Sequence, residues 1–259
     1  MLIDTHAHLQ LEHFDADREE VIRRAAEAGV EMIICVSTDV ASSRQAIALA
    51  EKHPGIFAAV GIHPNDCGAA AGKDFVEIAE LARHPKVVAI GEIGLDYYWK
   101  HVDPATQARA FVKQLELAWQ IDKPVIIHNR EAGEDILATL QGAGLTRLRG
   151  VFHCFSENAE YAERVLALGC HISFTGNLTY KKSPLPAIAE KIPLERLLLE
   201  TDCPFMAPMP HRGKRNEPAF TAAIAAQLAA LKNIETSHLS RLTSQNAARL
   251  FRLPGGLVP

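Results

Sequence analysis

Two histidines, His6 and His8, lie at the end of the first apolar run of the chain, Leu-Ile-Asp-Thr-His-Ala-His-Leu. On a β-strand, the side chains at positions i and i+2 point to the same face. Two imidazoles with this spacing can therefore bind one metal ion, and imidazole is a common ligand of zinc and similar cations. The alternative for an isolated pair is that both side chains only form hydrogen bonds at the end of a strand.

Further polar side chains stand at or just after the ends of other apolar runs. They are His63, Glu92, His128, His153 and Asp202. In an α/β barrel all of these positions lie at the carboxyl ends of the strands and face a common centre. One buried histidine often only satisfies hydrogen bonds. If the whole set converged, many polar groups would be crowded together without a structural use, and burying polar groups costs free energy. The pattern therefore favours a functional site.

The elements that must position these residues are short apolar runs rich in Val, Ile and Leu. The runs span residues 2–5, 32–36, 57–61, 87–91, 125–128, 150–153, 171–174 and 197–200. Continuous apolar runs of this length are typical of parallel strands buried on both faces. Helical patterns separate the runs, with clear boundaries at residues 18–28, 104–119 and 157–168. The alternation predicts an α/β fold, a (β/α)8 TIM barrel of the metal-dependent hydrolase type.

The alternative architecture is a doubly wound open sheet, which periodicity alone does not exclude. No G-x-G-x-x-G motif follows the first strand, which counts against a dinucleotide-binding fold. The chain also shows no linker, low-complexity tract or repeat. We therefore expect a single domain over residues 1–259, closed by extra C-terminal helices at about 218–232 and 237–251.

The composition is that of an ordinary globular protein, with 48% hydrophobic and 22% charged residues among 259. The formal net charge of -4 gives no global positive field to attract nucleic acid, so such a substrate would be held locally. Five cysteines without C-x-x-C spacing favour a reducing compartment. With no export signal or membrane-spanning run evident, we expect a cytoplasmic protein with no membrane association and no obligate protein partner.

Four histidines and two carboxylates are enough ligands for two divalent cations that share one carboxylate. Such a pair can polarise a phosphoryl oxygen and generate a hydroxide between the metals. Glu92 is the expected bridge because a carboxylate offers two oxygens, and no lysine follows it on the fourth predicted strand. Asp202 is expected to bind one metal and to accept a proton from the attacking water. Phosphate chemistry suits Mg²⁺ or Mn²⁺, whereas the imidazoles favour Zn²⁺.

Several segments in order along the chain resemble those of the TatD family of metal-dependent deoxyribonucleases. They are LIDTHAHL (2–9), GIHP (61–64), GEIGLDYY (91–98), PVIIHNR (124–130), FHCFS (152–156), LLLETDCP (197–204) and RNEP (215–218). The resemblance implies a divalent-metal-dependent exonuclease that cleaves phosphodiester bonds of DNA by attack of a metal-bound hydroxide. It also implies metal ligation by His6, His8, Glu92, His128, His153 and Asp202, with Glu92 and Asp202 catalytic.

Three residues depart from the usual pattern of this family. Gln10 stands where Asp or Asn usually follows H-x-H-L, Asn65 stands where His often follows G-x-H-P, and Cys203 replaces a more usual Ala. None of the three is an expected metal ligand. The departures therefore bear on substrate preference and rate more than on the reaction. Asp4 and Asp96 are expected to be structural.

Substrate contacts are expected from His63 and Arg130, because Arg suits bidentate binding of phosphate. The alternative for Arg130 is a surface ion pair with Glu131 or Glu134. Residues 97–99, Tyr-Tyr-Trp, are expected either to stack on bases or to pack in the fold. The basic groups at 181–182 and 211–215 either steer a nucleic-acid backbone or form a solvated surface.

Two other functions remain open from sequence. The same metal site could serve an amidohydrolase or lactonase acting on a small molecule, because the fold does not fix the function. The second alternative is a module that binds nucleic acid or protein and keeps an inert metal core, although no basic face supports it. Exonuclease polarity, DNA or RNA preference, metal identity, pathway and oligomeric state do not follow from the sequence.

Overall fold

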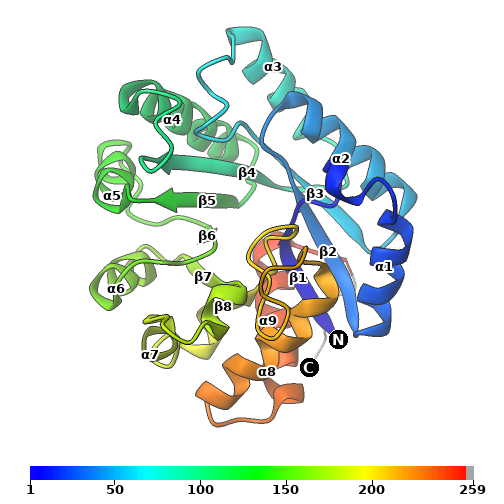
Figure 1. Ribbon diagram of the computed structural model, residues 1–259. Helices are drawn as coiled ribbons and strands as arrows, with labels where there is room; N and C mark the ends of the chain where they lie inside the picture. Colours follow the sequence, from blue (N-terminus) through cyan, green and yellow to red (C-terminus); the bar gives the residue numbers. More distant parts are fainter. Residues whose placement is uncertain (255–259) are drawn as a thin grey trace.

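The computed structural model describes residues 1–254, in which the strands form one parallel sheet in the order β1-β2-β3-β4-β5-β6-β7-β8. The strands are β1 (Leu2–Ala7), β2 (Val30–Val36), β3 (Ile56–Val60), β4 (Val87–Asp96), β5 (Val125–Arg130), β6 (Gly150–Phe152), β7 (His171–Phe174) and β8 (Leu197–Leu199). This sequential order confirms the predicted barrel, because a doubly wound sheet reverses its strand order. Figure 1 shows the helices arranged around the ring of strands.

The helices that follow the strands are α1 (Arg18–Glu27), α2 (Val40–Lys52), α3 (Gly72–Leu81), α4 (Pro104–Gln120), α5 (Gly133–Gly142), α6 (Ala159–Ala167), α7 (Leu185–Ala189), α8 (Thr221–Leu231) and α9 (Thr236–Phe251). Short 3-10 turns lie at η1 (Glu12–Phe14), η2 (Gly176–Thr179), η3 (Leu194–Arg196) and η4 (Pro218–Phe220). None of the helices within residues 1–254 is long and apolar enough to cross a bilayer.

The barrel closes where the end of β1 meets the segment after β8. The backbone N–H of His8 donates to the carbonyl of Cys203 at 2.9 Å, and that of Asp202 donates to the carbonyl of His6 at 2.8 Å. An isolated parallel bridge joins Ala7 to Cys203. Closure therefore uses the backbone of three predicted ligands, His6, His8 and Asp202, and it fixes His6 and Asp202 relative to each other.

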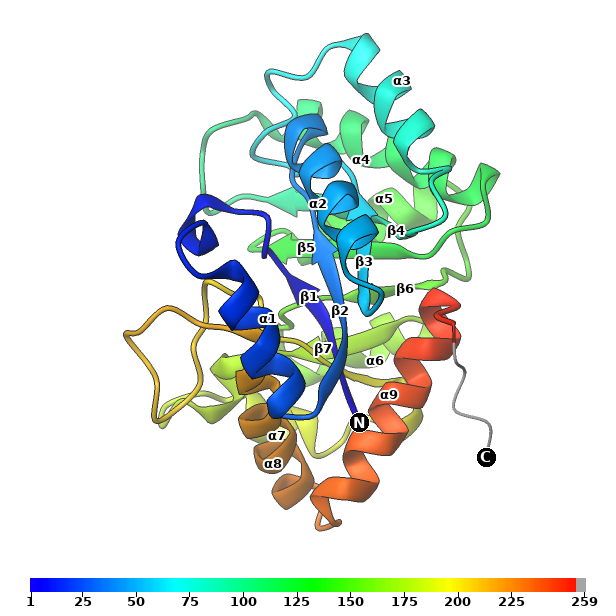
Figure 2. The same cartoon turned by 90° about the vertical axis from the view of Figure 1, so that its right-hand side faces the viewer.

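The opposite end of the barrel is closed by α9. One apolar cluster joins inward-facing strand residues such as Ile34, Phe57 and Ile126 to Leu250 and Phe251 of this helix. Figure 2 shows α9 on the side of the barrel opposite the loops that follow β1 and β8. The amino ends of the strands are thus covered by packed apolar side chains, and polar side chains can gather at the carboxyl ends.

Several observed boundaries differ from the expected ones. Strand β4 continues five residues past the expected end at Gly91, because Gly94, Leu95 and Asp96 pair with β5. Helix α6 begins at Ala159 rather than at residue 157, because the side chain of Asn158 caps it by accepting the N–H of Tyr161 at 2.9 Å. The expected helix at 218–232 begins with the 3-10 turn η4.

A candidate metal centre at the carboxyl ends of the strands

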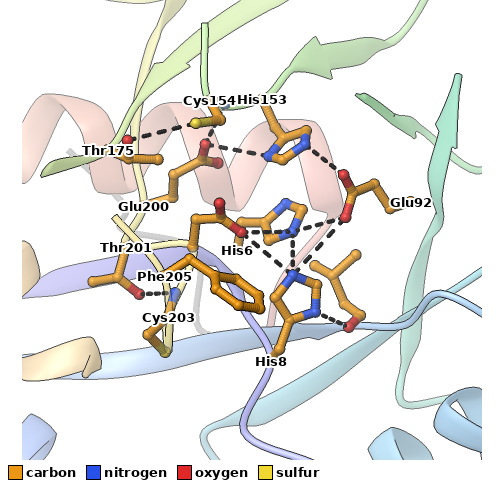
Figure 3. Close-up of polar contacts among 12 residues, drawn as sticks. His6, His8, Glu92, His153, Cys154, Thr175, Glu200, Thr201, Cys203 and Phe205 are labelled. Atoms are coloured by element: carbon orange, nitrogen blue, oxygen red, sulfur yellow. Dashed lines mark hydrogen bonds and ion pairs between the residues drawn. The ribbon is translucent and has the colours of Figure 1, made fainter. Parts of the chain in front are cut away.

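Glu92, on β4, contacts imidazoles on both sides of its carboxylate, and Figure 3 shows it beside His6, His8 and His153. The Oε1 atom of Glu92 lies 2.6 Å from His128 Nδ1, 2.7 Å from His153 Nε2 and 3.6 Å from His63 Nε2. The Oε2 atom lies 3.3 Å from His6 Nε2 and 3.9 Å from His8 Nε2. The two oxygens of one carboxylate therefore face two different sets of histidines.

Asp202 completes the side of the cluster formed by β1. Its Oδ1 atom lies 3.3 Å from His8 Nε2 and 3.7 Å from His6 Nε2. The backbone of Asp202 has a φ of 56°, a left-handed conformation that is uncommon for a residue other than glycine. Its N–H donates to the carbonyl of His6, which holds this conformation in place. Such conformations are typical of functional sites, where surrounding contacts stabilise them.

Irregular pairing in two strands positions the ligand candidates. Between Asp4 and Ala7, β1 advances three residues while its partner β2 advances two. Between Ile90 and Ile93, β4 advances three residues while β5 advances two. Extra residues of this kind redirect side chains, and they lie at His6 and at Glu92. Gly91 is required beside Glu92, because a Cβ there would lie 2.7 Å from the Cβ of Ile126.

The protonation pattern on the β1 side suits a cation. His8 Nδ1 lies 2.8 Å from the carbonyl of Val36, to which it can only donate, so in the neutral form of His8 the Nε2 atom carries the lone pair. That atom lies 3.2 Å from His6 Nε2, while His6 Nδ1 is buried without a hydrogen-bond partner in residues 1–254. Two ring nitrogens and two carboxylates that converge in this way match the donor set of a divalent metal site.

Carboxylates also hold the histidines on the other side of Glu92. His128 Nε2 lies 3.0 Å from Asp96 Oδ2, and His153 Nδ1 lies 3.6 Å from Glu200 Oε1. Histidines that bind metals usually have a carboxylate at the second ring nitrogen, which fixes the orientation and tautomer of the ring. Both histidines therefore present one nitrogen to Glu92; the other is hydrogen-bonded to Asp96 in His128, whereas in His153 it faces Glu200 without a hydrogen bond in residues 1–254.

The electrostatics of the cluster keep its acids ionised. Burial raises the pKa of Glu92, but the neighbouring charges and hydrogen bonds of His153, His63 and His128 outweigh it and hold the pKa well below the usual value. Burial, reinforced by His128, lowers the pKa of His63 to about 3. An ionised carboxylate and a neutral imidazole are the forms in which these groups bind metals.

Three groups of side chains could each hold a metal ion, because within each group the ligand atoms lie within 4.8 Å of one another. The groups are His6, His153 and Asp202; His6, His8 and Glu92; and His63, Glu92 and His128. Glu92 belongs to two of these groups, one built on β1 and one on β5. The six side chains expected as ligands from sequence thus lie in one cluster. His63, expected as a substrate contact, lies in the same cluster.

Arg130 lies at the end of β5, where its guanidinium carbon is 4.0 Å from the centre of the Tyr98 ring. The alternative ion pair with Glu131 or Glu134 is absent from residues 1–254, and Glu134 instead pairs with Arg164. Tyr98 is 46% exposed, as a base-stacking surface requires. The phosphate contact expected for Arg130 stays a prediction.

Two features of the site escaped the sequence analysis. Phe205, after β8, is 49% exposed, and its ring centre lies 6.2 Å from that of His8. Its position directly after the Thr-Asp-Cys-Pro segment was the only available signal. Asp96 was expected to be structural, but the sequence did not indicate that its carboxylate would hold His128.

The structure shows what two of the unusual residues contact. Gln10 Nε2 donates to the carbonyl of Val36 at 2.6 Å, the same carbonyl that His8 contacts. Asn65 Nδ2 donates to Asp96 Oδ2 at 3.1 Å. Both residues therefore support groups that orient histidines of the cluster.

Comparison with known proteins gives a family. Residues 3–252 match the family described as TatD related DNase. The chain is 43% identical to a protein of Bacillus subtilis named uncharacterized metal-dependent hydrolase YabD, over 98% of this chain and all of that protein. It is 38% identical to a protein of Edwardsiella piscicida named 3'-5' ssDNA/RNA exonuclease TatD, over 97% of this chain and all of that protein.

A solved structure agrees with these matches. The crystal structure of YJJV, a TatD homologue from Escherichia coli K12, superimposes with a TM-score of 0.92 at 34% identity, and 98% of each chain is covered. The family match, the sequence identities to these relatives and the barrel shared with the solved structure all extend over almost the whole chain. This chain belongs to the TatD-related DNase family of metal-dependent hydrolases.

Proposed function

We propose that this chain is a divalent-metal-dependent exonuclease that hydrolyses phosphodiester bonds at the ends of DNA strands. The proposed metal ligands are the six side chains that converge on the carboxyl ends of the strands, namely His6, His8, Glu92, His128, His153 and Asp202. Glu92 and Asp202 are also the proposed catalytic residues, and His63 and Arg130 are the proposed contacts of the substrate phosphate.

The observation that carries this proposal is the position of Glu92 between two sets of imidazoles. Its Oε2 atom faces His6 and its Oε1 atom faces His128, at 3.3 Å and 2.6 Å. A carboxylate that offers one oxygen to each side suits a pair of cations about 3.5–4 Å apart. Paired cations are a recurrent solution for phosphodiester hydrolysis, since they can stabilise both the attacking and the leaving oxygen.

When bound, divalent cations would supply polarisation of the phosphoryl oxygen and a lower pKa for water. The residues of the chain supply position and proton transfer. Asp202 lies at the rim of the cluster, with 14% of its side chain exposed, where its carboxylate can take the proton of the attacking water. Arg130 can bind the phosphate that is cut, because its guanidinium is fixed over Tyr98.

The proposed substrate draws support from the names of relatives. Proteins of Edwardsiella piscicida and Erwinia tasmaniensis that are 38% and 37% identical to this chain are named 3'-5' ssDNA/RNA exonucleases. The exposed rings of Tyr98 and Trp99 offer surfaces on which unpaired bases can stack, which favours a single-stranded end as the substrate.

The proposal is tested by stripping the purified chain with a chelator and restoring Mg²⁺, Mn²⁺ or Zn²⁺ separately. An end-labelled single-stranded DNA should then be shortened from one end, and a strand with its ends joined in a circle should be left intact. If the cation-loaded chain leaves single-stranded and duplex DNA uncut, the proposal is wrong. Cyclic amides and lactones serve as comparison substrates, because faster hydrolysis of these would favour an amidohydrolase or lactonase.

A further inference from the structure

A pocket of about 490 Å³ lies between the loop after β7 and the loop after β8. The β7 loop contributes Tyr180, Lys181 and Lys182, and the β8 loop contributes Met209 and Arg212. Because both loops follow barrel strands, the pocket lies at the same end of the barrel as the metal centre. The β8 loop, drawn in gold, projects from this end in Figure 2.

The pocket is cationic in a chain whose net charge is -4. Lys181, Lys182 and Arg212 are exposed, and none of them has a carboxylate within 4.0 Å in residues 1–254. Arg215, three residues after Arg212, is different because it pairs with Asp17 at 2.7 Å. Three unpaired cations around one hollow form a local positive field, which attracts an anionic ligand.

Hydrogen bonds join the two loops that carry the cations. The hydroxyl of Tyr180 donates to the carbonyl of Ala207 at 3.2 Å, and the N–H of Met209 donates to Thr179 Oγ1 at 2.8 Å. Gly176 lets the two loops approach, since a Cβ there would clash with the carbonyl oxygen of Met206. The guanidinium carbon of Arg212 lies over the Tyr180 ring, 4.4 Å from its centre. A fixed arrangement of cations binds an anion with less loss of side-chain entropy.

Asn177 connects this pocket to the metal centre. It lines the pocket, is only 8% exposed, and its Nδ2 atom lies 3.8 Å from Cys154 Sγ. Cys154 directly follows His153, and its N–H donates to Glu200 Oε1 at 2.5 Å. The pocket is therefore linked to the cluster through Asn177, Cys154 and Glu200. A strand whose end reaches the metals can place another phosphate there.

We propose that the pocket of Lys181, Lys182 and Arg212 binds a backbone phosphate of a single strand, away from the phosphate that is cut. This inference rests on the proposed nuclease function and names its substrate as a polynucleotide rather than a small phosphate ester. The pocket volume of about 490 Å³ suits a nucleotide-sized group. The apolar side chain of Met209 and the Tyr180 ring can face the sugar while the cations face the phosphate.

Binding by the metal-stripped chain tests this directly. The probe is a fluorescein-labelled oligothymidylate about 12 nucleotides long, within the usual range of single-strand sites. Its anisotropy is followed from about 50 to 200 mM salt. The variant Lys181→Ala/Lys182→Ala/Arg212→Ala should bind about tenfold more weakly or worse. For this variant, the slope of the logarithm of the binding constant against the logarithm of the salt concentration should be smaller in magnitude by about 0.7 for each lost phosphate contact.

A control with the same change in charge is available. Lys52, Arg147 and Lys191 are exposed and precede β3, β6 and β8, at the far end of the barrel. The variant Lys52→Ala/Arg147→Ala/Lys191→Ala should bind the probe like the unchanged chain. If both triple variants lose affinity equally, only net charge matters and the pocket is not a site. Retained affinity and slope in the pocket variant would also overturn the inference.

Kinetics separate this inference from the proposed function. With cations restored, the ratio of kcat/KM for the oligonucleotide to that for bis(4-nitrophenyl) phosphate should fall about tenfold in the pocket variant. An unchanged ratio, with an active parent chain, overturns the inference alone. If the parent chain cuts neither compound, the nuclease proposal fails while the binding result stands. Competition by inorganic phosphate as strong as that by the oligonucleotide would indicate a small-anion site instead and also overturn the inference.

Discussion

Asp96 shows how a single carboxylate can set the geometry of His128, one of the proposed metal ligands. It accepts hydrogen bonds from the N–H groups of Tyr98 and Trp99 at 3.0 Å each and from Asn65 at 3.1 Å. Its other contact is His128 Nε2 at 3.0 Å. Burial raises the pKa of Asp96, but the hydrogen bonds from His128 and Trp99 outweigh it and lower the pKa to about 2. An ionised Asp96 therefore fixes the ring of His128.

Replacing Asp96 by Asn should weaken metal binding or activity by about 10–100-fold, as the loss of such supporting groups usually does. The amide lacks the charge that favours a proton on His128 Nε2 and a lone pair on Nδ1. Metal affinity by competition with a chromogenic chelator, and kcat on the labelled oligonucleotide, measure the effect. The control is Asp135→Asn, which changes an exposed carboxylate bonded to Tyr97. Equal affinity in D96N and the unchanged chain would contradict this role.

At the scale of elements, the irregular pairing of β4 is what aims Glu92 at the centre of the barrel. The i, i+2 spacing of His6 and His8 predicted that their side chains share one face, and their Nε2 atoms lie 3.2 Å apart. The extension of β4 to Asp96 was not predictable in the same way. Residues 91–96 contain Gly91, Glu92 and Gly94, which interrupt the apolar pattern that marks a buried strand.

Substitution of Gly91 by Ala should lower the free energy of unfolding by about 1–3 kcal/mol, the usual cost of forcing an extra methyl into a packed core. The new Cβ would lie 2.7 Å from Ile126 Cβ and 3.2 Å from the carbonyl oxygen of Ile126. Urea unfolding measures the change. Gly72→Ala is the matched control, because within residues 1–254 a Cβ at that position would have no contact within 4 Å beyond its chain neighbours and its own helix backbone. Equal unfolding midpoints for the two variants would show that β4 tolerates the methyl group.

Helix α9 should contribute strongly to stability because it closes the apolar end of the barrel. Phe251 is 2% exposed within the cluster of inward-facing strand residues. The substitution Phe251→Ala is expected to cost about 3–5 kcal/mol, measured as a shift of the urea midpoint. Trp119→Ala removes a ring that is 77% exposed, so it should change stability by less than about 0.5 kcal/mol. A small effect at Phe251 would mean that α9 is not part of the core.

At the scale of the whole molecule, the sequence was sufficient for the barrel and for the set of side chains at its mouth. Parallel buried strands produce continuous apolar runs, and the residue after each run lies at one end of the barrel. Contacts between distant loops have no comparable pattern in the sequence. The stacking of Arg130 on Tyr98 and the approach of Met206 to Gly176 depend on loop conformations, which have no periodic pattern.

The pH dependence of global stability should carry a contribution from His171, at the start of β7 and far from the metal centre. Burial, together with Arg196, lowers the pKa of His171 to about 4. In the unfolded chain it titrates near pH 6.5, so between about pH 6.5 and 4 only the unfolded state binds the proton. Stability from this group is therefore complete above about pH 6.5 and is lost as the pH falls towards 4.

Thermal unfolding at about pH 5 and pH 7 measures this contribution. The decrease in Tm from pH 7 to pH 5 should be larger in the unchanged chain than in His171→Gln by about 2–4 °C, corresponding to roughly 1 kcal/mol. Parallel behaviour of the two proteins would show that His171 binds its proton equally well in both states.

Metal stoichiometry is the most direct test of the proposal that Glu92 would help to hold two cations. The chain is stripped, loaded with Mn²⁺ or Zn²⁺, dialysed and assayed by elemental analysis beside Glu92→Gln and the surface control Glu31→Gln. The account predicts about two cations per chain for the unchanged protein and the control, and fewer than about one for Glu92→Gln. A chain that holds no cation, or a Glu92→Gln variant that keeps both, would contradict it.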